Sequence, residues 1–111
     1  MKLVILGSGA SANTHAQAIK NTGVFELYGV CGNMVNEVEQ FAERYGIRAF
    51  GSLQEVLALK DVVAVSVCTP SGLHAQQGIE IARAGKNVFM EKPIAISVQE
   101  AIKLVDTCRA H

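Results

Sequence analysis

The chain has 111 residues (11.8 kDa), ten basic and ten acidic side chains, and 50% hydrophobic residues. This length suits one domain with its own core, and the apolar composition excludes an intrinsically disordered chain. A formal net charge of zero without a basic cluster argues against nucleic acid as a partner, and no apolar run reaches the roughly 20 residues of a membrane span. The cysteines lack metal-ligand spacing, so we expect no metal site, no disulfide scaffold and a cytoplasmic protein. They are Cys31, Cys68 and Cys108.

Five short apolar runs, rich in Val and Ile, divide the chain. The stronger ones are apolar at nearly every position, as strands are when helices cover both faces of a parallel sheet. We therefore predict strands at 2–6, 27–31, 48–50, 62–68 and 87–90.

The segments between these runs have the periodicity of helices. Apolar residues recur at helical spacing in 34–45 and 98–109. Capping boxes mark two helix starts, at 52–55 and 97–100. Glycines mark three helix ends, at Gly23, Gly46 and Gly85. Alternating strands and helices with short loops and right-handed crossovers predict an α/β doubly wound parallel sheet. We therefore expect a Rossmann fold with strand order 3-2-1-4-5, truncated before the sixth strand.

A glycine loop follows the first predicted strand and opens the first helix. Its sequence, Gly7-Ser8-Gly9-Ala10-Ser11-Ala12, matches the dinucleotide-binding pattern G-x-G-x-x-G/A. Gly7 allows the tight turn, Gly9 leaves room for a pyrophosphate, and Ala12 lets the helix pack closely on its strand. Free N–H groups at the positive end of the helix dipole would hold the phosphates, with Ser8 and Ser11 at the rim. An ordinary glycine turn is the alternative, but the place after the first strand of a βαβ unit favours dinucleotide binding.

The end of the second predicted strand lacks the acidic residue that usually holds the adenosine ribose. Gly32 and Asn33 stand there, and the nearest arginine is Arg44 on the next helix. An acid would repel a 2′-phosphate and an arginine would attract one, so the choice between NAD and NADP stays open. Gly32 and Asn33 are candidate cofactor contacts, and Asn33 could equally be a turn residue or a helix cap.

Two further loops end at the same edge of the predicted sheet. Thr69 and Pro70 follow the fourth strand, at the switch point where doubly wound sheets bind ligands. Glu91 and Lys92 follow the fifth strand and are placed for chemistry, although a solvated charge pair in a turn is an equal alternative.

Two histidines belong to the same region of the predicted fold. His15 shares a helical face with Ala12 and Ala16, so we predict that it packs and makes a structural hydrogen bond. His74 opens the fourth helix, where a cofactor contact and a helix cap are equal alternatives.

Three motifs together resemble the glucose–fructose oxidoreductase/inositol dehydrogenase/MocA family. They are Gly7-x-Gly9-x-x-Ala12-x-x-His15, Cys68-Thr69-Pro70-x-x-x-His74 and Ala84-Gly85-Lys86-Asn87-Val88-Phe89-Met90-Glu91-Lys92-Pro93. The resemblance covers essentially the whole chain, and its third motif is the most specific. It implies an NAD(P)-dependent oxidoreductase that transfers a hydride between nicotinamide and a hydroxyl of a sugar, sugar nucleotide or polyol.

The resemblance also implies roles for single residues. The glycine loop would hold the pyrophosphate, while Thr69 and Pro70 would line the cofactor groove with His74 near it. Glu91 would meet the nicotinamide-side ribose. Lys92, joined to Pro93 by a peptide bond that is often cis in this family, would reach the substrate hydroxyl. An ammonium group there stabilises a developing alkoxide and can relay its proton, which makes Lys92 the candidate catalytic residue.

Members of this family carry a second domain that supplies most substrate contacts and an Asp–His acid/base pair. We expect residues 1–111 to be the dinucleotide-binding domain, with the second domain absent from this chain and no complete turnover by this chain alone. The strand at 87–90 would then be an open edge through which the domain could self-associate.

Two other functions fit part of this pattern. A stand-alone NAD(H)-binding or redox-sensing module would need the glycine loop but no substrate-facing Lys92. A methyltransferase fold also uses glycine loops, but the run ending in Glu91-Lys92-Pro93 and the missing acid after the second strand disfavour it.

Overall fold

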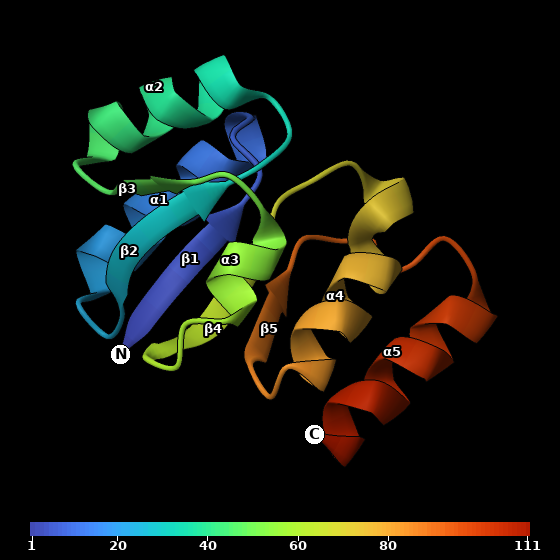
Figure 1. Ribbon diagram of the computed structural model, residues 1–111. Helices are drawn as coiled ribbons and strands as arrows, with labels where there is room; N and C mark the ends of the chain where they lie inside the picture. Colours follow the sequence, from blue (N-terminus) through green and yellow to red (C-terminus); the bar gives the residue numbers. More distant parts are fainter.

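The strands and helices form a single parallel sheet with helices on both sides. The computed structural model describes residues 1–111 and has the strand order β3-β2-β1-β4-β5 (Figure 1). The strands are β1 (Lys2–Leu6), β2 (Glu26–Cys31), β3 (Arg48–Phe50), β4 (Val62–Val67) and β5 (Asn87–Met90). The helices are α1 (Ala10–Thr22), α2 (Val35–Tyr45), α3 (Leu53–Leu57), α4 (His74–Arg83) and α5 (Val98–Ala110), with a 3-10 turn η1 (Ser71–Leu73) before α4. All neighbouring strands pair in parallel, which confirms the predicted sheet and its order.

Each face of the sheet has its own core. On one face α1 and α2 cover Leu3 and Ile5 of β1 together with parts of β2. On the other face α3 and α4 cover Val4 and Leu6 together with parts of β4. Successive side chains of a strand point to opposite faces, so a strand covered on both sides must be apolar at every position. This is why β1 reads as a continuous apolar run and shows no alternation.

The predicted helix boundaries rest on local hydrogen bonds and backbone conformation. The Ser52 hydroxyl accepts from the Glu55 N–H at the start of α3, and the Ser97 hydroxyl accepts from the Glu100 N–H at the start of α5. Gly23, which ends α1, has φ = 71°, in the left-handed region that glycine adopts most readily. These contacts confirm the helix ends that the sequence predicted.

The last helix is attached mainly to its neighbour α4. Leu104 is its one buried side chain, and it packs over Gly78 of α4, where an added Cβ would lie 2.8 Å from Leu104 Cδ1. Glycine at position 78 thus lets the two helices pack closely, and a larger residue would have to displace the ends of the Leu104 and Met90 side chains. Strand β5 pairs with β4 alone, so its outer edge is open. No helix of the chain combines the length and apolarity that crossing a bilayer would need.

Candidate functional site

A cavity of about 480 Å³ opens at the carboxyl ends of β1, β2 and β4. In a doubly wound sheet this is the switch point, where the chain leaves β1 toward one face and β4 toward the other. The cavity brings together most of the predicted cofactor contacts: Gly7, Ser8, Gly9, Ala10, Ser11, Gly32, Asn33, Thr69 and Pro70. Residues that the sequence reasoning did not select complete the lining: Leu6, Met34, Glu37, Cys68, Leu73 and Gln77.

Gly7 and Gly9 have different structural roles in the loop. Gly7 has φ = 112°, and a Cβ at this position would lie 2.7 Å from the Cys68 carbonyl oxygen. Any other residue at this position would strain the backbone and crowd the Cys68 carbonyl, so glycine here stabilises the fold. Gly9 has an ordinary φ of −86°, and a Cβ built there meets no atom within 4 Å. Space beside Gly9 is open to the cavity, and a side chain would fill it.

The amino-terminal end of α1 presents unpaired hydrogen-bond donors to this space. Gly9 caps the helix without a side-chain hydrogen bond, and the first intrahelical bond runs from the Asn13 N–H to the Gly9 carbonyl. The N–H groups of Ala10, Ser11 and Ala12 are thus left without intrahelical acceptors. The Ser11 hydroxyl is also buried and has no hydrogen-bond partner. Unpaired hydrogen-bond donors next to an open space can bind a diphosphate, so the residues of this loop fit a dinucleotide.

The loop after β4 forms the wall opposite the glycine loop. The Thr69 hydroxyl is hydrogen-bonded to the Gln77 side chain of α4, which fixes the loop against that helix. Burial raises the pKa of the Cys68 thiol and outweighs the opposing influence of the nearby Ser66 and Ser11 hydroxyls. The Cys68 side chain therefore stays a neutral, apolar part of the wall.

The end of β2 lies at the other side of the cavity. Gly32 is close-packed, since an added Cβ would lie 3.1 Å from Val38 Cγ2. Asn33 lines the cavity and does not cap α2, because Met34 occupies the cap position. Glu37 in the first turn of α2 lines the cavity too and brings a carboxylate to this end. Arg44 is directed elsewhere, since its guanidinium donates to Asn13 Oδ1 at 2.8 Å.

His74 lies behind the cavity wall and does not line the cavity. The side chain is buried, with 2% exposed. Its Nε2 is 2.6 Å from the Thr69 carbonyl oxygen, and its Nδ1 is 2.7 Å from the Pro93 carbonyl oxygen. The ring therefore ties the loop after β4 to the loop after β5 and makes no side-chain cap for α4. Its proposed contact with the cofactor stays a prediction. Ala12, on the buried face of α1, packs in the core with β1, the packing position that the sequence assigned to it.

Glu91 and Lys92 lie next to the cavity and outside its lining. The Glu91 N–H donates to the Val67 carbonyl at the end of β4, which places Glu91 beside Cys68. Its Oε1 is 2.5 Å from His15 Nε2, and His15 Nδ1 is 2.6 Å from the Ser66 hydroxyl. The structural hydrogen bond predicted for His15 is confirmed. Lys92 is exposed and makes no hydrogen bond or ion pair, and the Lys92–Pro93 peptide bond is cis, as the resemblance implied.

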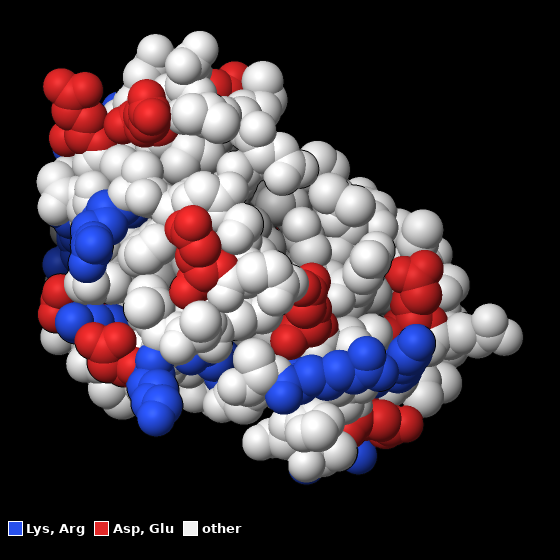
Figure 2. All heavy atoms as spheres, in the orientation of Figure 1, with Lys and Arg blue, Asp and Glu red and all other residues white.

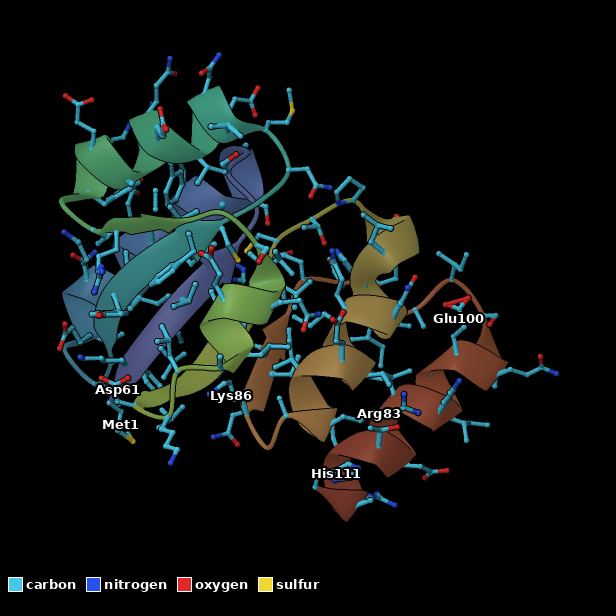
Figure 3. The ribbon with its side chains drawn as sticks, in the orientation of Figure 1. Met1, Asp61, Arg83, Lys86, Glu100 and His111 are labelled. Atoms are coloured by element: carbon cyan, nitrogen blue, oxygen red, sulfur yellow. The ribbon has the colours of Figure 1, made fainter.

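Other charged groups lie at the opposite edge of the sheet or over the helices. Asp61 precedes β4, and its carboxylate is 2.7 Å from Lys2 Nζ at the amino-terminal ends of the strands (Figure 3). Acidic side chains lie over α2 at the top of Figure 2, and charges of both signs mix over α4 and α5. A larger groove of about 600 Å³ between these two helices is lined by Glu80, Arg83, Glu100 and Lys103, among others. No group of three or more His, Cys, Asp or Glu side chains is arranged to hold a metal ion.

The glycine loop could be identified from sequence because it is local, whereas Glu37 and Gln77 were missed. Glu37 lies five residues beyond Gly32, and only the helical turn of α2 returns it to the cavity. Its place in the first helical turn after a strand end was the available signal. Gln77 shows no comparable signal, since its position depends on how α4 packs.

Comparison with known proteins identifies the group to which the chain belongs. A family model described as an oxidoreductase family with an NAD-binding Rossmann fold (GFO/IDH/MocA) matches residues 1–111. Among curated relatives, 4-carboxy-2-hydroxymuconate-6-semialdehyde dehydrogenase of Sphingobium sp. is 35% identical over 91% of this chain and 32% of its own length. Inositol 2-dehydrogenase of Rhizobium meliloti is 32% identical over 96% of this chain and 33% of its own length.

A solved structure agrees with these relatives. The WlbA dehydrogenase of Bordetella pertussis, crystallised with NADH and UDP-GlcNAcA, superposes with a TM-score of 0.93 at 32% identity, over 99% of this chain and 33% of that one. The chain thus spans about a third of the length of the relatives it matches. By its sequence, its fold and the match over its whole length, the chain belongs to this oxidoreductase family, in which it corresponds to the NAD-binding Rossmann domain.

Proposed function

We propose that the chain binds a nicotinamide dinucleotide with its diphosphate on the amino-terminal end of α1. The observation that carries the proposal is the open space beside Gly9, bordered by the unpaired N–H groups at the start of α1. Backbone donors and the helix dipole together stabilise the phosphate charge, and the unpaired Ser11 hydroxyl offers a further hydrogen bond. The adenosine half would extend toward Gly32, and the nicotinamide half would cross Cys68 toward Glu91.

We further propose that the protein takes part in hydride transfer at a hydroxyl of a sugar, sugar nucleotide or polyol. Relatives named inositol 2-dehydrogenase and D-glucoside 3-dehydrogenase act on such compounds, and WlbA was crystallised with UDP-GlcNAcA. The bound nicotinamide would supply the hydride acceptor or donor. Lys92, exposed and free of partners, would stabilise negative charge on the substrate oxygen and hold its proton at Nζ.

The charge at the adenosine end supports a preference for NAD over NADP. Glu37 adds a carboxylate to the cavity near Gly32, and Arg44 is held by Asn13. A 2′-phosphate within about 5 Å of a carboxylate is disfavoured by roughly 1.4–2.7 kcal/mol, depending on solvent exposure, which is about tenfold to a hundredfold in affinity. Glu37 would thus replace the missing acid at the end of β2.

Titration with NADH and NADPH, followed by nicotinamide fluorescence, tests both statements. We expect NADH to bind at least about tenfold more tightly, and Glu37→Gln to narrow that difference, because the variant removes the repelling charge. Glu39→Gln, on the same helix and outside the cavity lining, is the matched control and should leave the ratio unchanged. Failure of both nucleotides to bind at millimolar concentration would refute the proposed function. Equal affinities for the two would refute the role of Glu37 alone.

A further inference from the structure

A chain of polar contacts connects the interior of the sheet to the surface beside the proposed nicotinamide site. It runs from Ser66 on β4 through His15 on α1 to Glu91 after β5, with distances of 2.6 Å and 2.5 Å. The Cys68 thiol lies 3.8 Å from the Ser66 hydroxyl and adds a weak contact at the inner end. Three elements that are distant in sequence therefore meet in one hydrogen-bonded group.

The chemistry of the partners fixes the direction of these hydrogen bonds. A carboxylate only accepts, so His15 Nε2 carries a hydrogen and donates to Glu91 Oε1. In the neutral ring Nδ1 is then the acceptor, and the Ser66 hydroxyl donates to it. Ser66 thus selects the tautomer and orientation of His15, and His15 in turn fixes one oxygen of Glu91.

Two members of this group, Ser66 and His15, are largely buried, so their polar contacts are part of the packed interior. Ser66 is 1% exposed and is the only polar residue of β4; all the remaining residues of this strand are apolar. Burying a hydroxyl costs free energy unless it is hydrogen-bonded, and a valine would fit the pattern of the strand better. The serine is explained by its partner His15, which is itself only 21% exposed.

The outer end of the group lies beside the cavity and is partly exposed. The Glu91 side chain is 39% exposed, and its second oxygen, Oε2, has no partner in the chain. Glu91 follows β5 next to Cys68, which lines the cavity. A dinucleotide whose diphosphate rests at Gly9 brings its second ribose to this side, where ribose hydroxyls are natural donors to a carboxylate.

We propose that His15 and Ser66 are positioning residues, which hold the Glu91 carboxylate so that Oε2 accepts a hydrogen bond from the nicotinamide-side ribose. This inference rests on the proposed function, since it names how that site recognises one half of its ligand. A carboxylate fixed before binding loses less conformational entropy when the ligand arrives, so the network raises affinity without touching the ligand.

Two ligands separate this role from a merely structural one. NADH carries the second ribose, whereas ADP carries the diphosphate and adenosine without it. We expect His15→Ala to lower the affinity for NADH about tenfold and Ser66→Ala to lower it about threefold. Losses of this size correspond to a weakened charge-assisted hydrogen bond between Glu91 and the ribose. Neither variant should change ADP affinity by more than about twofold, which also shows that the variants are folded. Gln17→Ala, an exposed position on α1, is the control and should leave both affinities unchanged.

A double-mutant cycle shows whether His15 acts through Glu91. In a Glu91→Ala background, the further change His15→Ala should leave the affinity for NADH almost unchanged, because the carboxylate that His15 positions is already absent. An equal loss in both backgrounds, or an equal loss for NADH and ADP, would overturn the inference while leaving the proposed function intact. If the unaltered chain bound neither ligand, the proposed function would fail and this inference with it.

Nitrogen NMR of the imidazole gives a readout that does not depend on the ligand. At pH 8 we expect His15 in the tautomer with hydrogen on Nε2, and Ser66→Ala should move the Nδ1 resonance because its hydrogen-bond donor is lost. Hydrogen on Nδ1, or a ring signal indifferent to Ser66→Ala, would contradict the assigned chain of bonds.

Discussion

The two glycines of the loop after β1 give opposite predictions from the same motif. Gly7 lies at φ = 112° with its Cβ direction blocked by the Cys68 carbonyl, whereas Gly9 lies at φ = −86° with its Cβ direction open. Gly7→Ala should therefore destabilise the fold, and Gly9→Val should leave the fold intact while blocking the cofactor. A pattern of glycines in a sequence does not distinguish these two roles.

The expected magnitudes follow from this geometry. An alanine in the left-handed region costs about 1–2 kcal/mol, and relief of the 2.7 Å contact with the Cys68 carbonyl adds to this cost, for a total of roughly 2–4 kcal/mol. For a domain of this size such a loss lowers Tm by about 10–25 °C. The valine at position 9 should lower the free energy of unfolding by no more than about 1 kcal/mol, the cost of replacing glycine at a helix cap. The same variant should lower the affinity for NADH at least about a hundredfold, since the valine side chain separates the phosphates from two or more backbone donors.

Urea unfolding and NADH titration of both variants form the assay. Gly9→Ala serves as the intermediate case, with a smaller obstruction of the cavity and a similarly small loss of stability. If Gly9→Val unfolded the chain as much as Gly7→Ala did, the space beside Gly9 would be part of the packed interior. If it bound NADH normally, the diphosphate would lie elsewhere.

Four further outcomes test other parts of the account. Burial raises the pKa of the Cys31 thiol from 9.0 to about 12, so the folded state keeps a proton that the unfolded state loses. Stability from this group is therefore complete below pH 9 and declines toward pH 12, by up to about 1.4 kcal/mol per pH unit, and Cys31→Ala should flatten this decline in urea titrations. Ser97→Ala removes the acceptor for the Glu100 N–H and should cost about 1 kcal/mol, seen as a lower urea midpoint. Leu104→Ala removes the buried anchor of α5 and should cost roughly 2–4 kcal/mol, with a loss of amide-exchange protection concentrated in that helix. Lys92→Ala should leave NADH affinity within about twofold and lower turnover by about 10²–10⁴-fold in a protein that includes the substrate-binding region, and full turnover there would refute the role of Lys92.

The fold was accessible from sequence because its signals are local and consistent. Val and Ile runs, two capping serines and the left-handed glycines each indicated the same elements, and right-handed crossovers then left one strand order. Deviations are confined to element ends: β2 starts at Glu26, one residue earlier than predicted, and β4 stops at Val67, one residue earlier.

The site could be predicted where it is built from short segments that directly follow predicted strands, such as the glycine loop, Gly32 to Asn33 and Thr69 to Pro70. The loop from Gly7 to Ser11 was found as a motif, and its members line the cavity together. The sequence could not show that His74 turns both ring nitrogens to backbone carbonyls, or that His15 connects Ser66 to Glu91. Those contacts depend on the packing of α1 and α4 across the sheet, which no spacing along the chain encodes.

Backbone amide NMR during a titration with NADH shows whether the diphosphate binds at the start of α1. We expect the N–H resonances of Ala10, Ser11 and Ala12 to shift with a single dissociation constant, since these unpaired donors would receive the diphosphate. Saturable binding whose shifts are confined to the groove between α4 and α5, with Ala10 to Ala12 unmoved, would contradict this expectation.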